Sequence, residues 1–359
     1  MADQLHSALT SRGVLCIAAM LLAAACGESA QEPAPAPASG TVRSPKNPTE
    51  APSAPPAPQI VALPAEPVPP APSTQACAPA RSGTIGDRSV KLKVGGRDRT
   101  FELHVPKGYD GTKGTMLLLN FHGYMMDGPS MRWVTKLDEY ADLSGFIVAY
   151  PDGLSKSWNA GDCCGEAWKS NGVDDVEYAR AIVSHLSAEY CVDPTLVYAS
   201  GFSNGGFLSH RLACEASDVF AAIASVAGAM GIRPSDCLPS RPVPVLQVHG
   251  TADMVVRYDG GHPFVPLGPV EFRSVDETLS TWRQRNGCLG SAETTYQKGE
   301  VTCQRWGTCK RDADVELCTV TEGGHQWPGG NPITSGGHLS GDVSASAAML
   351  KFFAAHPMR

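Results

Sequence analysis

Five consecutive residues form a Gly-x-Ser-x-Gly pentapeptide, Gly201-Phe202-Ser203-Asn204-Gly205. The apolar run 196–200 before it predicts a strand, and residues 206–213 after it predict a helix. A serine in a tight turn between a strand and a helix is typical of a nucleophile elbow, in which small neighbours leave the hydroxyl exposed. The pentapeptide alone is weak evidence in a chain rich in Gly and Ser, so its position carries the prediction that Ser203 is a nucleophile.

Such a nucleophile needs an imidazole to take its proton and a carboxylate to orient that imidazole. Asp253 follows the apolar run 243–248, and His325 follows the strand-like run 315–320. The order Ser203, Asp253, His325 is the one expected of an α/β-hydrolase. These three residues are therefore the predicted catalytic triad.

Each partner has an alternative interpretation. Asp favours turns, so Asp253 could serve only a turn, and Asp259 and Asp276 are rival acids that are less well placed after a strand. Any of the ten histidines could be structural. His325 stands out because glycines on both sides free its backbone to swing the ring toward a neighbouring strand end.

An ester hydrolase also needs donors for the oxyanion. The most apolar run, 116–121, predicts a central strand and ends in His122-Gly123-Tyr124. We expect the backbone N–H groups of Tyr124 and Asn204 to form the oxyanion hole. A second pair, His249-Gly250, shows that the dipeptide alone could mark an ordinary turn.

Longer strings around these positions identify a family. From about residue 83 to 353 the chain resembles the secreted polyhydroxybutyrate depolymerase-like and feruloyl esterase-like carboxylesterases, including their lipoprotein esterases. The resemblance implies an α/β-hydrolase fold, hydrolysis of carboxylic esters and the same triad. It rests on these strings: Phe121-His122-Gly123, Tyr150-Pro151-Asp152-Gly153, Ser157-Trp158-Asn159-Ala160-Gly161-Asp162-Cys163-Cys164-Gly165, Gly172-Val173-Asp174-Asp175-Val176, 201–206, His249-Gly250-Thr251-Ala252-Asp253 and Gly323-Gly324-His325-Gln326-Trp327-Pro328-Gly329-Gly330.

Two positions depart from the family, and the first of them, near the pocket, bears on the substrate and not on the mechanism. Arg257 stands before Tyr258 where members often have Pro, and Tyr124 stands where many have Cys or Phe. We predict a polyhydroxybutyrate depolymerase-like esterase, with a feruloyl or acetyl-xylan esterase as the alternative. A serine peptidase usually brings a further gating domain, and a surface binding protein on a catalytically dead scaffold is the alternative from another class.

Aromatic side chains near the predicted site could contact substrate. Trp327 lies two residues after His325, and Trp158 lies in one of the family strings. An aromatic face could hold the acyl or alcohol part of an ester. The alternative is that each indole only packs its own loop.

The N-terminal part has the pattern of a targeting segment. Residues 14–25 are apolar but too short to span a bilayer, and small residues precede Cys26, as in a bacterial lipoprotein box. We predict a signal peptide over 1–26 with lipidation at Cys26, the alternative being an ordinary cleaved signal. The Pro- and Ala-rich stretch 27–76 predicts a disordered linker, and 77–359 one catalytic domain.

The cysteine content and the net charge limit which metals, nucleic acids or cofactors the chain is expected to bind. Ten cysteines lie beyond the signal, and an even number in an exported chain predicts disulfides; metal binding lacks the paired C-x-x-C units it needs. We expect Cys214 to pair with Cys237, and Cys163 and Cys164 to make two separate bridges. The net charge of −7 without a basic stripe gives no support for nucleic-acid binding, and no cofactor is expected.

The remaining pattern predicts alternating strands and helices. An early hairpin is expected over 89–94 and 99–105, a strand over 146–150, and helices over 175–183 and 344–355. Asp174 is interpreted as a helix N-cap. Alternation of this kind predicts an α/β fold with a mostly parallel sheet, with the site at the carboxyl ends of its strands.

Overall fold

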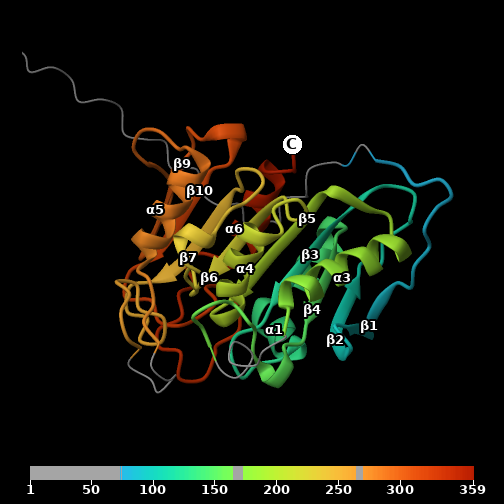
Figure 1. Ribbon diagram of the computed structural model, residues 1–359, viewed down its shortest axis with the longest axis horizontal. Coiled ribbons are helices and arrows are strands. Elements are labelled where there is room, and N and C mark those ends of the chain that lie inside the picture. The colour runs from blue at the N-terminus through green and yellow to red at the C-terminus, as the bar shows by residue number, and fades with distance from the viewer. Residues whose placement is uncertain (1–72, 74, 165–172, 264–269) are drawn as a thin grey trace, which may run out of the picture. The chain divides into compact units, whose positions relative to one another are not determined.

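A ten-stranded sheet forms the centre of the described part of the chain. The computed structural model describes residues 73, 75–164, 173–263 and 270–359. The strand order is β1-β2-β4-β3-β5-β6-β7-β10-β9-β8 (Figure 1). The strands are β1 (Gly86–Val94), β2 (Arg97–Val105), β3 (Thr115–Phe121), β4 (Ile147–Pro151), β5 (Val192–Phe202), β6 (Ala222–Val226), β7 (Val245–Gly250), β8 (Glu293–Lys298), β9 (Val301–Trp306) and β10 (Val315–Val320).

The centre of this sheet is parallel and its edges are antiparallel. The six strands β4, β3, β5, β6, β7 and β10 run parallel to one another. A hairpin of β1 and β2 extends one edge, and β9 and β8 extend the other. The predicted mostly parallel sheet is therefore confirmed, and the carboxyl ends of β3, β5, β7 and β10 lie at one edge of the sheet.

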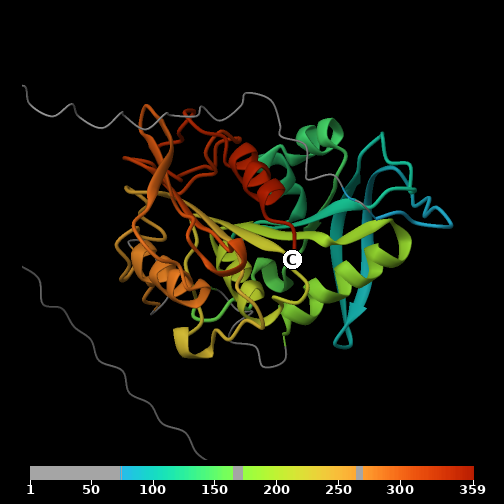
Figure 2. The ribbon, with the colours of Figure 1, turned by 90° about the horizontal axis from the view of Figure 1, so that it is seen from above.

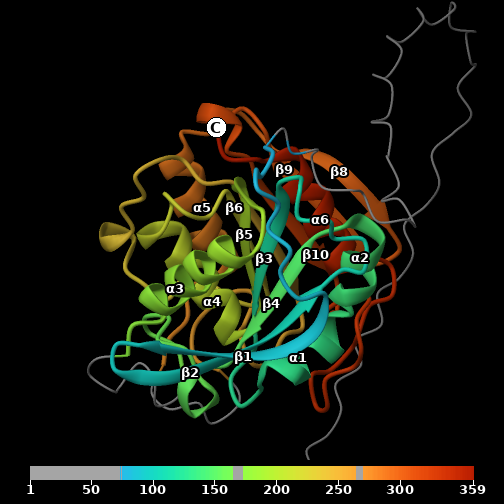
Figure 3. The same ribbon diagram turned by 90° about the vertical axis from the view of Figure 1, so that its right-hand side faces the viewer.

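Helices cover both faces of the sheet. Helices α3, α4 and α5 lie on one side, and α2 and α6 lie on the other (Figure 3). Seen from above, the red α6 and the yellow-green α3 are separated by the sheet (Figure 2). The helices are α1 (Gly128–Thr135), α2 (Leu137–Ser144), α3 (Asp175–Glu189), α4 (Asn204–Glu215), α5 (Val275–Asn286) and α6 (Ala345–Ala355).

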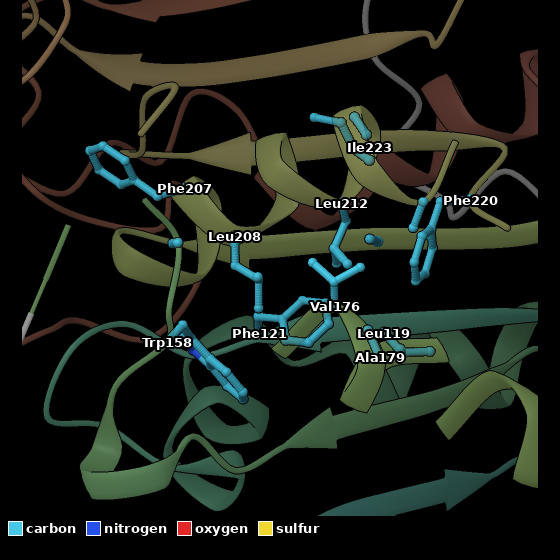
Figure 4. Close-up of a cluster of buried hydrophobic side chains, with 14 of the residues drawn as sticks. Leu119, Phe121, Trp158, Val176, Ala179, Phe207, Leu208, Leu212, Phe220 and Ile223 are labelled. Carbon is cyan, nitrogen blue, oxygen red and sulfur yellow. The ribbon is translucent and has the colours of Figure 1, made fainter. Parts of the chain in front are cut away.

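Alternation along the central strands produces two cores. In β3, Leu117 and Leu119 join the cluster under α3, α4 and α5, whereas Met116 and Leu118 join the cluster under α1, α2 and α6. Successive side chains of a strand point to opposite faces, so a strand between two helical layers must be apolar throughout. Figure 4 shows the first cluster, in which Leu119 lies among residues of α3 and α4.

The strongly patterned elements were predicted, and the polar or short ones were missed. The hairpin, the strands that lead to the site and the cap of α3 are confirmed; the Asp174 side chain accepts the Glu177 N–H at 2.8 Å. Helix α5 was missed because its outer face is strongly polar. Its signal was a capping box, in which Ser274 and Glu277 each bond the other's backbone N–H.

Five disulfides link the described residues. The predicted pair Cys214–Cys237 is confirmed and joins the end of α4 to the loop before β7. The prediction of two separate bridges from Cys163 and Cys164 is wrong, because these two cysteines bond to each other. The other eight described cysteines bond to one another, so the described part of the chain offers the adjacent pair no other partner. The remaining bonds are Cys77–Cys191, Cys288–Cys309 and Cys303–Cys318.

The predictions for the signal peptide, for lipidation of Cys26 and for nearly all of the linker fall outside the described residues. None of the helices in the described part of the chain has the length and hydrophobicity of a membrane span.

Candidate active site

Ser203 occupies a strained turn between β5 and α4. Its backbone has φ 52° and ψ −119°, in a region of positive φ that non-glycine residues rarely adopt. The two flanking glycines make the turn possible. A Cβ on Gly201 would lie 2.3 Å from the Gly205 carbonyl carbon, and one on Gly205 would lie 2.2 Å from the Phe121 oxygen. The geometry is that of the predicted elbow.

Asp253 and His325 meet because β7 and β10 are parallel neighbours. Their loops leave the same edge of the sheet, and His325 Nδ1 lies 2.7 Å from Asp253 Oδ2. A carboxylate accepts, so Nδ1 carries the proton and Nε2 is left as the acceptor. Among the described residues Nε2 makes no hydrogen bond, as a base that must receive a serine proton requires.

The carboxylate of Asp253 is buried yet held ionised. It is 3% exposed, and its Oδ1 accepts the N–H groups of Val255 and Val256, both at 2.8 Å. Burial alone would raise the pKa of Asp253. The interactions of the carboxylate with His325 and with His249 outweigh burial and hold that pKa well below its usual value.

His325 also lies beside the elbow. Its ring centroid is 4.7 Å from that of Phe202, the residue directly before Ser203. In the described residues the Ser203 hydroxyl makes no hydrogen bond to another group. The structure thus brings the serine turn, the imidazole and the carboxylate to one end of the sheet.

The two predicted oxyanion donors lie on touching segments. The start of α4 packs against the end of β3, since a Cβ on Gly205 would also lie 2.7 Å from the His122 oxygen. Neither the Tyr124 N–H nor the Asn204 N–H has a hydrogen-bond partner among the described residues. Asn204 is the first residue of α4, where backbone N–H groups are free and the helix dipole is positive.

His122 is a loop clamp that the sequence did not reveal. Its Nδ1–H donates to the Gly123 oxygen at 2.7 Å, and its Nε2 accepts the Gly153 N–H at 2.9 Å. The ring is fully buried, and this burial lowers the pKa of His122 to about 4. A neutral imidazole therefore ties the loop that carries Tyr124 to the loop after β4.

Both tryptophans predicted to contact substrate are fully buried. The Trp327 indole donates to Ser346 Oγ at 3.0 Å and packs under α6. The Trp158 indole donates to the His122 oxygen at 2.8 Å and lies edge-on to Phe121 (Figure 4). The prediction of substrate contact is wrong for both, because neither ring presents a face to solvent. Each packs the loops that carry the site.

Two clusters have the side-chain types of a metal site, and each is already satisfied. Cys303 and Cys318 are joined in a disulfide, which removes the thiolates that would ligate beside Glu316. Around His104, Arg132 pairs with both Asp87 and Asp138. Within the described residues the polar groups around Ser203 fit nucleophilic chemistry.

Comparisons with known proteins point to esterases. The chain is 36% identical to feruloyl esterase B of Piromyces equi over 230 residues, which cover 61% of this chain and only 41% of that protein. It is 32% identical over 266 residues to NocK of Nocardia uniformis subsp. tsuyamanensis, named as an esterase, covering 70% of this chain and 76% of that protein.

The fold agrees with these relatives. The acetyl xylan esterase of Aspergillus awamori superposes with a TM-score of 0.54 at 15% identity, covering 74% of this chain and 98% of that one. A family model described as the prolyl oligopeptidase family matches residues 133–242. That match includes the elbow at Ser203 and ends before Asp253.

Proposed function

Because the chain belongs to an esterase family with the α/β-hydrolase fold, we propose that it hydrolyses carboxylic esters of the plant cell wall with Ser203 as nucleophile. The observation that carries this proposal is the buried pair of His325 Nδ1 and Asp253 Oδ2, 2.7 Å apart, beside a serine in an elbow turn. A hydrogen bond of that geometry from a neutral imidazole to a carboxylate, beside a nucleophile elbow, prepares the imidazole to act as a base.

The reaction is a two-step acyl transfer. His325 Nε2 takes the hydroxyl proton of Ser203 as its oxygen attacks the ester carbonyl carbon. The N–H groups of Tyr124 and Asn204 donate to the oxyanion of the tetrahedral intermediate. The proton on Nε2 passes to the leaving alcohol, and the acyl group remains on the serine. Water, deprotonated by His325, then releases the acid and regenerates Ser203.

The names of the relatives support the substrate class. Feruloyl esterase B and the bifunctional acetylxylan esterase/xylanase of Neocallimastix patriciarum act, by name, on feruloyl and acetyl esters. They favour the feruloyl or acetyl-xylan alternative over the polyhydroxybutyrate depolymerase-like interpretation. Polyester oligomers therefore enter the test as a competing substrate.

We further propose the domain division of the sequence analysis, with export, a lipid on Cys26 and the linker 27–76 as a tether for the catalytic domain. Five disulfides support an oxidising compartment. A lipidated protein stays with the membrane fraction, and Cys26→Ser should release it. Equal membrane retention of the two proteins would contradict the anchor.

The decisive experiment compares the full chain with Ser203→Ala on methyl ferulate, acetylated xylan, 3-hydroxybutyrate oligomers and a short activated ester. Ser203→Ala should lower kcat by roughly 10⁶-fold, as loss of a triad serine does. Ser209→Ala, which removes a hydroxyl that donates to the Gly205 oxygen on the same helix, is the matched control and should keep its activity.

Preferred hydrolysis of methyl ferulate or acetylated xylan supports the proposed substrate class. Preferred hydrolysis of the oligomers moves the substrate to polyesters and leaves the mechanism intact. A wild-type protein that cleaves none of the four esters supports the binding-protein alternative.

A further inference from the structure

A second imidazole lies behind the acid. His249 Nε2 is 3.5 Å from Asp253 Oδ2, the same oxygen that receives His325 Nδ1 at 2.7 Å. Both the His249 and the Asp253 side chains are buried. The acyl-transfer steps make no use of His249, although it contacts the group on which the base depends.

The hydrogen bonds of His249 permit one tautomer. Its Nε2 lies 2.7 Å from the Val256 oxygen, which only accepts, so Nε2 carries the proton. Its Nδ1 must then accept, and Gln247 Nε2 donates to it at 2.9 Å. The second proton of the Gln247 amide goes to the Gly228 oxygen, also at 2.9 Å, which fixes the orientation of that amide.

The chain of bonds continues to α5. Gln247 Oε1 accepts from His210 Nε2 at 3.2 Å, so the His210 proton is on Nε2. His210 Nδ1 accepts from Trp282 Nε1–H at 3.0 Å, and an indole can only donate. All three side chains are fully buried, and burial lowers the pKa of His210 to about 4. Each member therefore has one satisfied orientation.

At its other end, the series of hydrogen bonds from Trp282 to His249 closes around Asp253. The loop from Asp253 to Val256 folds back, so that the Val256 N–H reaches Asp253 Oδ1 while the Val256 oxygen receives the His249 proton. His249 Nε2–H donates to that oxygen, and Asp253 Oδ2 lies 3.5 Å from the same nitrogen. Rotation of the carboxylate would break the bonds to Val255, Val256 and His325 together.

We infer that His249 is a positioning residue for Asp253, and that the buried chain Gln247–His210–Trp282 sets its tautomer. This inference rests on the proposed triad. The orientation of Asp253 controls how firmly His325 is held in the tautomer with a free Nε2, on which proton transfer from Ser203 depends. Side chains of α4 and α5 thus support the acid through Gln247 and His249.

The first test replaces the imidazole in two ways. His249→Phe keeps a ring of similar size without polar atoms, and His249→Gln keeps an N–H donor near the position of Nε2. In His249→Phe we expect kcat to fall about tenfold with KM within about twofold, because a misplaced catalytic group slows proton transfer without weakening binding. His249→Gln should recover most of kcat.

The pH profile separates positioning from packing. The groups that face His249 are Asp253 and Tyr258 from its own loop, His325 through Asp253, and His210 of α4 through Gln247. In His249→Phe the midpoint on the acid side of the kcat/KM profile should move to lower pH, since a displaced carboxylate stabilises the imidazolium less. A lower Tm with an unmoved midpoint and unchanged kcat would overturn the inference.

A remote variant keeps the test decisive if His249→Phe does not fold. Trp282→Phe removes only the donor to His210, and kcat should fall about threefold with a midpoint shift in the same direction, a fraction of the effect expected at the acid itself. Tyr198→Phe is the control, since it loses one buried hydrogen bond of 2.9 Å to the Phe353 oxygen. Identical kinetics for Trp282→Phe and Tyr198→Phe would contradict the proposed role of the hydrogen bonds from Trp282 to His249.

Nitrogen-15 chemical shifts of the histidine rings distinguish this inference from the proposed function. Wild-type protein should show His249 and His210 as neutral Nε2–H tautomers whether or not any tested ester is cleaved. If the tautomers are found but no ester is hydrolysed, the proposed function fails and the chain stands as structure alone. If esters are hydrolysed and either tautomer differs, the inference fails by itself.

Discussion

Two His-Gly pairs lie at the ends of two parallel strands on either side of β5, the strand that leads to Ser203. Their imidazoles have different roles. His122-Gly123 follows β3, and its imidazole joins two loops through the Gly123 oxygen and the Gly153 N–H. His249-Gly250 ends β7, and its imidazole lies against Asp253 and accepts from Gln247. Both rings are buried and neutral. The His-Gly dipeptide therefore places an imidazole at the carboxyl end of a strand, and the groups around that imidazole decide its role.

The glycines of the two pairs differ in the same way. A Cβ on Gly250 would lie 2.2 Å from the Gly323 oxygen, so the β7 end touches the backbone of the His325 loop. A Cβ on Gly123 would lie 2.9 Å from Phe202 Cδ1 and 3.2 Å from Met126 Sδ. Gly250 allows close approach of a backbone segment, and Gly123 allows close approach of two side chains.

The largest effect should come from removing the His122 imidazole, which joins the Tyr124 loop to the loop after β4. His122→Leu removes the two side-chain hydrogen bonds by which His122 holds the Tyr124 loop. Loss of one oxyanion donor costs between about 10²- and 10³-fold in kcat. The midpoint of the kcat/KM profile should stay in place, because His122 contacts neither Asp253 nor His325. Steady-state kinetics across pH measure both quantities. A midpoint shift as large as that of His249→Phe would remove the distinction between the two pairs.

Acid unfolding should reveal two neutral histidines. One is His122 of the first pair, and the other is His210, which Gln247 links to His249 of the second pair. Burial lowers the pKa of His122 and of His210 to about 4, so the unfolded chain binds these protons first as pH falls below about 6.5. The free energy of unfolding should therefore decline from pH 6.5 toward pH 4, by up to about 3 kcal/mol for each histidine.

Urea titrations at pH 7 and pH 4.5 measure this decline. His122→Gln or His210→Gln should lose about half of the pH-dependent difference, because each removes one of the two protons. The depressed pKa of Asp253 adds stability that persists above about pH 4 and is lost only at lower pH. An unchanged difference in both variants would show that other groups carry the acid sensitivity.

The smallest effects should come from the glycines. Gly250→Ala should lower the free energy of unfolding by about 2 kcal/mol, since a backbone oxygen cannot give way, and Gly123→Ala by about 1 kcal/mol. Thermal unfolding of the two variants side by side tests the order. Equal losses, or a larger loss at Gly123, would contradict the view that only the second pair is packed against backbone.

The sequence predicted the central fold because its signals were local. Apolar runs fix buried strands, and turn residues fix where Ser203, Asp253 and His325 follow them. Parallel strands then bring these loops to the same edge, as the bond between His325 and Asp253 shows. Strand β6 was missed because its alanine-rich run, Ala222–Val226, is short and carries little hydrophobic signal.

The features that the sequence did not predict depend on contacts between residues far apart in the chain. The indoles of Trp158 and Trp327 could have faced substrate or core, and only packing against His122 and Ser346 decides the matter. The link from Trp282 to His249 joins residues of α5, α4 and β7 through side-chain rotations. Residue type and spacing contain no information on such rotations.

The bond Cys77–Cys191 has a mechanical consequence. It spans 114 positions and ends one residue before β5, the strand that leads to Ser203. Tension on the chain before Cys77 passes through two sulfur atoms to the middle of the sheet. Strands β1 to β4 lie within the covalent loop and off that path. A pull from the N-terminal side therefore cannot peel the edge hairpin away, and the strand that leads to the nucleophile takes the force instead.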